Sequence, residues 1–75
     1  MLFRSVLLEW PSLVGSQIAG VTAPRMVTED GVLFVGVKTH AWMSELTLME
    51  RTLLAKINAR DGRAPITRIR WELLR

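Results

Sequence analysis

The stretch Gly31–Leu46, GVLFVGVKTHAWMSEL, decides the fold of this chain because two periodicities meet inside it. Side-chain character alternates over its first half, and this period of two predicts a strand over residues 32–38. From Trp42 onward the apolar residues recur at steps of three and four, which predicts a helix ending at about residue 59 or 60. Thr39 is suited to cap that helix. Because so few residues connect the strand to the helix, the helix must fold back over the sheet that contains the strand.

The N-terminal segment, residues 2–20, has a helical pattern that Pro11 interrupts, since proline lacks a backbone donor and clashes with the preceding turn. We predict a helix from Pro11 to Ala19 with a looser helical segment before it. A single longer helix kinked at Pro11 is the alternative. The apolar stripe of this segment consists of Leu7, Trp10, Val14, Ile18 and Val21.

Two more strands are expected around the central stretch. Residues 25–29 are a weak strand candidate that follows a connector over residues 21–24, and Asp30–Gly31 predicts a hairpin turn. Residues 66–73 alternate as a third strand. One face of that strand carries Thr67, Ile69, Trp71 and Leu73, and the other carries Ile66, Arg68, Arg70 and Glu72.

The order helix, strand, strand, helix, strand predicts a single α+β domain over residues 1–75. The first two strands form a hairpin, and the long helix returns the chain so that the third strand lies parallel to the second. The resulting three-stranded mixed sheet receives both helices on one face. The expected core consists of Trp10, Leu33, Val35, Val37, Trp42, Leu46, Leu53, Ile57 and Ile69. Trp71 is either a core residue or an anchor for a partner.

The 75 residues carry a net charge of +3, and the excess of Lys and Arg lies after Glu50. A polyanionic partner and a solvated basic surface both fit such a balance, and charge alone favours the solvated surface. The chain has no cysteine, which suits a reducing compartment, so we expect a cytoplasmic protein. No apolar run reaches the length of a membrane span, and Glu9 interrupts the N-terminal run that faintly resembles a signal peptide.

No constellation of residues for catalysis is evident in the sequence. The single histidine, His40, has no partner at metal-ligand spacing, and the glycines form no phosphate loop. We therefore expect no enzyme activity, no metal and no cofactor.

The best candidate for a binding site is the sheet face turned away from the helices, which would carry Phe34, Gly36, Lys38, Arg68 and Arg70. An aromatic ring among cations can stack a base and hold phosphates, and Arg63 is a further candidate for phosphate contact. The alternative, weighted equally, is that the arginines are the polar side of an amphipathic strand and Phe34 is a lone exposed aromatic.

An ordered set of residues resembles the DciA family of bacterial proteins that assist loading of the DnaB-type replicative helicase. The set comprises Trp10-Pro11, Val14-Gly15, Ile18-Ala19, Pro24, Gly31 with Leu33, Val35 and Val37, Ala41-Trp42, Glu45-Leu46, Leu53-Leu54, Ile57-Asn58, Gly62, and Ile66 through Ile69-Arg70. The resemblance implies a KH-like fold, DNA binding, contact with the helicase and no ATPase activity. This chain differs from nucleic-acid-binding KH domains because it lacks their Gly-X-X-Gly loop between two helices. Family members often carry a flexible tail, so a short form or a trimmed domain is expected here.

The resemblance therefore implies a helicase-loading accessory factor that binds DNA, single-stranded or at junctions, and a DnaB-type helicase through separate surfaces. Phe34, Lys38, Arg63, Arg68 and Arg70 are the predicted DNA contacts. A KH-like RNA-binding module and a pure protein-interaction domain are the alternatives.

Overall fold

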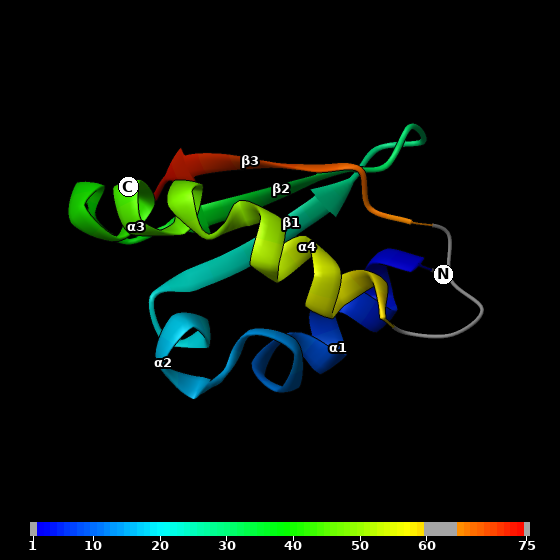
Figure 1. Ribbon diagram of the computed structural model, residues 1–75, viewed down its shortest axis with the longest axis horizontal. Coiled ribbons are helices and arrows are strands. Elements are labelled where there is room, and N and C mark those ends of the chain that lie inside the picture. Colours follow the sequence, from blue (N-terminus) through cyan, green and yellow to red (C-terminus); the bar gives the residue numbers. More distant parts are fainter. Residues whose placement is uncertain (1, 60–64, 75) are drawn as a thin grey trace.

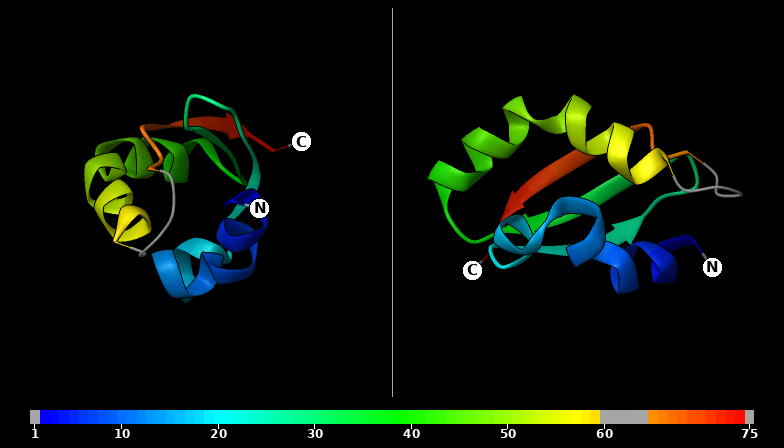
Figure 2. Two further views of the ribbon diagram at one scale, coloured as in Figure 1. Left: turned by 90° about the vertical axis from the view of Figure 1, so that its right-hand side faces the viewer. Right: turned by 60° about the horizontal axis from the view of Figure 1, so that its bottom comes forward.

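The computed structural model describes residues 2–59 and 65–74, with side chains from residue 6 onward. Its elements are α1 (Leu2–Val14), α2 (Ser16–Ala19), β1 (Thr22–Val27), β2 (Val32–Val37), α3 (His40–Leu48), α4 (Glu50–Asn58) and β3 (Arg68–Leu73). The strands lie in the order β1-β2-β3, with β1 antiparallel and β3 parallel to β2. The helices cover one face of this sheet (Figures 1 and 2), so the predicted KH-like α+β fold is confirmed.

The turn between β1 and β2 is the predicted hairpin. The amide of Thr28 donates to the carbonyl of Val32 over 2.9 Å, and the Thr28 hydroxyl donates to Asp30 Oδ1 over 2.8 Å. Gly31 has a φ of 87°, a conformation that costs an L-residue free energy. A Cβ at this position would also lie 2.8 Å from the Pro65 carbonyl oxygen, so the turn requires glycine on two counts.

The prediction that a helix starts at Pro11 is wrong. α1 passes through Pro11, and the break comes instead at Gly15, whose φ is 92°. Pro11 is exposed, so water can bond the carbonyl that the proline leaves without a partner. Val6 and Trp10 are buried one turn apart and hold the helix on the core. The stripe begins at Val6, because Leu7 is 46% exposed.

Three other boundaries differ from those predicted. β1 begins at Thr22 and includes Pro24, which an edge strand tolerates, and a bulge between Pro24 and Met26 weakens its alternation. The long helix divides at Met49 (φ −94°, ψ 3°) into α3 and α4. Ile66 was expected on the polar face of the third strand but is buried, because β3 begins only at Arg68.

The core lies between the sheet and the helices. Within the described part of the chain, its predicted members Trp10, Leu33, Val35, Val37, Leu46, Leu53, Ile57 and Ile69 are buried, together with Val6, Val14, Ile18 and Ile66. Trp42 and Trp71 are partly exposed and pack against this cluster. No helix among the described residues combines the length and the apolar character that crossing a bilayer requires.

Side-chain hydrogen bonds fasten the elements to one another. Trp10 Nε1 donates to the Thr22 hydroxyl over 2.9 Å, and that hydroxyl donates to the Ile18 carbonyl over 2.7 Å. The Thr39 hydroxyl accepts from the Trp42 amide over 3.1 Å, which confirms the predicted helix cap. These contacts position β1 and β2, and with them the outer face of the sheet.

Two further side chains fasten β3 to α4. Asn58 at the end of α4 bonds both backbone groups of Ile66, at 2.8 Å and 2.7 Å. A Glu50 carboxylate oxygen at the start of α4 accepts from the Ile69 amide over 3.0 Å. The strand that carries the two arginines of the candidate site is therefore held at its beginning by one helix.

Candidate nucleic-acid interface

The outer face of the sheet, turned away from the helices, brings one aromatic ring and two cations together. Phe34 pairs with Arg70 in the parallel ladder and with Met26 in the antiparallel ladder. Val32 pairs with Arg68 one step earlier along the strands. A row Met26–Phe34–Arg70 thus crosses all three strands, with Arg68 beside it.

The Arg70 guanidinium lies over the Phe34 ring, with its central carbon 5.9 Å from the ring centroid. This distance is within the range of a cation–π contact. Phe34 is partly exposed, and Arg68 and Arg70 are exposed. Within residues 6–59 and 65–74 neither arginine is held in an ion pair. Both guanidinium groups are therefore available to an anionic ligand.

Near the C-terminal ends of β2 and β3, a side chain covers the outer face of the sheet, which the sequence did not indicate. Gly36 was expected to be an open part of the platform, but it is buried, and a Cβ there would collide with the Leu74 side chain. The Leu74 side chain therefore covers Gly36. Glu72, the strand partner of Gly36, places an exposed carboxylate in the same row.

Lys38 lies beyond this closed end and apart from the arginines. It follows β2 four residues after Phe34, a separation of roughly 13 Å at about 3.3 Å per residue. Its amide donates to the Val21 carbonyl over 2.9 Å, and its side chain is exposed. The candidate site therefore contains Phe34, Arg68 and Arg70, with Lys38 separate, and the predicted contact Arg63 lies outside the described residues.

Sequence reasoning did not assign Met26 to this site, although the hairpin turn contains the signal. The Thr28–Val32 hydrogen bond closes the hairpin, and counting outward from it by two residues sets Met26 opposite Phe34. Met26 is 50% exposed, which is high for an apolar side chain within a sheet.

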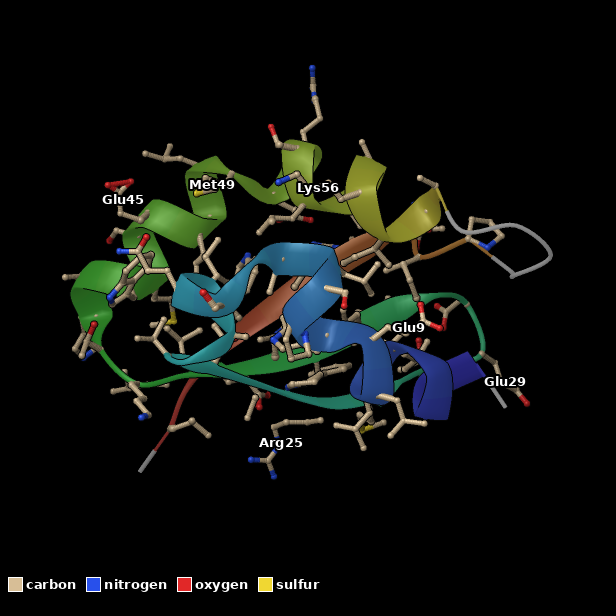
Figure 3. All side chains as sticks on the ribbon, turned by 90° about the horizontal axis from the view of Figure 1, so that it is seen from below. Glu9, Arg25, Glu29, Glu45, Met49 and Lys56 are labelled. Carbon is tan, nitrogen blue, oxygen red and sulfur yellow. The ribbon has the colours of Figure 1, made fainter. Side chains whose placement is uncertain are left out.

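Charged side chains of both signs lie on the helical side of the molecule. Figure 3 shows Glu9, Glu45 and Lys56 on three different helices, so charges of both signs are spread over that side. His40 is exposed in the first turn of α3. Nowhere in the described ranges do three or more His, Cys, Asp or Glu side chains form a group that could hold a metal ion.

Comparison with known proteins gives one family and a set of mycobacterial relatives. The sequence model of the family described as "Dna[CI] antecedent, DciA" matches residues 1–71. A UPF0232 protein of Mycobacterium ulcerans (strain Agy99) is 39% identical over 66 residues, which cover 88% of this chain and 35% of the relative.

Two other relatives, both UPF0232 proteins, give a similar result. That of Mycobacterium leprae (strain TN) is 39% identical over 62 residues, which cover 83% of this chain and 32% of the relative. That of Mycobacterium tuberculosis (strain CDC 1551 / Oshkosh) is 44% identical over 57 residues, with 76% and 30% covered. The matched region thus spans about a third of each of these three curated relatives.

Proposed function

We propose, from the premise that this chain belongs to the DciA family, that it is a DNA-replication accessory factor which helps to load a DnaB-type helicase onto DNA. The family match over residues 1–71 supports this role and bears out the resemblance seen in the sequence. The role is one of positioning: the domain brings the ring helicase and a DNA strand together and performs no chemistry itself. The proposal concerns this domain, because the matched region covers only about a third of each relative.

The observation that carries the DNA contact is the grouping of Phe34, Arg68 and Arg70 on the outer face of the sheet. The two guanidinium groups would bind the DNA, since a guanidinium suits phosphates by its charge and geometry and bases by its planar face. The Phe34 ring would contact a base. Lys38, which follows β2 beyond the end covered by Leu74, would contact a phosphate separately from these three residues.

The helicase would be bound by a surface other than the outer face of the sheet. A DNA strand lying on that face leaves α3 and α4, on the opposite side, open to a protein partner. Binding both partners at once is what a loading factor requires.

The test is a titration of labelled single-stranded DNA at two salt concentrations. We expect binding that weakens steeply with salt, because phosphate contacts release counterions. Arg68→Glu should weaken binding at both salt concentrations, whereas Lys56→Glu, the same charge change on α4, should leave most of it. Failure of the wild-type protein to bind even at low salt would exclude the DNA contact. Co-purification with the replicative helicase, with and without DNA, tests the second partner.

The same face would also accommodate RNA, because none of its described side chains is specific to deoxyribose. Competition between RNA and DNA of one sequence separates the two ligands. A purely protein-binding domain would lose its partner on Arg68→Glu while binding neither nucleic acid.

A further inference from the structure

The row Met26–Phe34–Arg70 has the components of a small binding site. The thioether of Met26 lies on the strand position opposite Phe34, where the two Cβ atoms of a cross-strand pair are about 5 Å apart. On the other side of Phe34, the Arg70 guanidinium covers the ring. Met26 is 50% exposed and Arg70 is exposed, so the described neighbours leave both accessible to a ligand.

This row is open toward one end of the strands and closed toward the other. The preceding row holds Val32 and Arg68, an apolar surface next to an exposed cation. The following row holds Gly36 beneath Leu74, and Glu72 beside it. Consecutive rows are about 7 Å apart, so a ligand on Phe34 meets a cation on one side and a carboxylate on the other.

We infer that this row is a site for one unpaired nucleobase, which inserts between the Phe34 ring and the Arg70 guanidinium with its phosphate toward Arg68. The inference rests on the proposed function and specifies the DNA site within it. Arg70 already occupies the stacking face of the ring at 5.9 Å, so insertion requires only that a long exposed side chain move outward onto the base. Its planar guanidinium stacks on the second face of the base.

Two consequences distinguish this site from a general basic surface. The site selects single strands, because a paired base within a duplex has both of its faces covered by neighbours. Leu74 and Glu72 limit it to one base, since the next base along the strand would meet the leucine and its phosphate the carboxylate.

The experiment compares two labelled oligonucleotides of equal length and equal phosphate count, an oligo-dT and an oligomer of abasic sites. We expect the wild-type protein to bind oligo-dT about 5- to 150-fold more tightly, which is the range for one base–aromatic stack. Phe34→Leu should reduce binding of oligo-dT to the abasic level and leave its salt dependence unchanged. Arg70→Lys keeps the positive charge but removes the planar guanidinium, so it should also lower the preference for oligo-dT over the abasic oligomer. Because Arg70 is exposed, this variant keeps the test valid should Phe34→Leu fail to fold.

Glu72→Gln supplies an independent readout. At low salt, where the Debye length exceeds 10 Å, removing the carboxylate should tighten binding of both oligomers severalfold. Glu45→Gln, the same change at an exposed position of α3, is the matched control and should have no effect.

The outcomes separate the inference from the function on which it rests. If the wild-type protein binds neither oligomer, the DNA contact itself fails. If it binds both equally, or if Phe34→Leu folds and keeps the full preference for oligo-dT, the one-base site is wrong while the DNA contact stands.

Discussion

Replacing Asn58 with alanine should lower the stability of the whole domain, although Asn58 is itself largely exposed at the end of α4. Its amide nitrogen donates to the Ile66 carbonyl over 2.8 Å, and its amide oxygen accepts from the Ile66 N–H over 2.7 Å. One side chain thus satisfies both backbone groups of the residue that enters the core just before β3. Asn58→Ala leaves both of them without their protein partner.

The expected size of the effect follows from these two contacts. Each hydrogen bond contributes about 0.5–1.5 kcal/mol net, so the pair is worth about 1–3 kcal/mol. Alanine is a better helix former than asparagine by up to about 0.7 kcal/mol, which offsets part of the loss. A net fall of about 1–2 kcal/mol in the free energy of unfolding should lower Tm by about 4–16 °C in a domain of this size.

Thermal and urea denaturation, followed by circular dichroism, measure this change. Asn58→Asp retains the acceptor for the Ile66 N–H and loses the donor to the carbonyl, so it should destabilise as well. Thr52→Ala, on an exposed position of α4, controls for helix propensity and should be neutral or slightly stabilising. If the free energy of unfolding of Asn58→Ala lies within about 0.5 kcal/mol of the wild-type value, the two contacts do not hold β3 as described.

Three further substitutions test other contacts by the same denaturation measurements. Gly31→Ala should destabilise by about 1–3 kcal/mol, since it places a Cβ at positive φ and 2.8 Å from the Pro65 carbonyl; equal stability would mean that the turn rearranges freely. Thr22→Val should cost about 1–3 kcal/mol because it leaves Trp10 Nε1 without its acceptor, whereas Thr22→Ser should retain most of the stability. Thr39→Ala should cost about 1 kcal/mol through loss of the cap of α3, and Thr39→Asp should restore it.

The features predicted correctly from the sequence depend on local chemistry. The Asp30–Gly31 turn, the Thr39 cap and the alternation of β2 each follow from a few adjacent residues, and all three are present. The path of α1 through Pro11 could not be predicted this way, because burial of Val6 and Trp10 against distant elements outweighs the preference of the proline.

The candidate site was predictable to the extent that it depends on strand alternation. Alternation and parallel pairing place Phe34 and Arg70 side by side, as the sequence indicated. The sequence contained no comparable signal for the Leu74 side chain over Gly36, because that contact depends on how far the chain follows β2 after β3 ends. The separation of Lys38 from the arginines depends on the same register.

The hydrogen bond from the Ile69 amide to Glu50 bears on how copies of this domain behave at high concentration. An edge strand exposes unpaired backbone groups that can pair with an extended segment of another chain. Such pairing is a common first step of aggregation. At β3 an approaching chain would have to displace a carboxylate and lie against its charge. At β1, the opposite edge strand, Pro24 lacks a backbone N–H donor, and the adjacent bulge disturbs the spacing of the other backbone groups. Both edges of the sheet therefore resist the addition of a fourth strand, so the domain can reach high concentration without polymerising through its sheet.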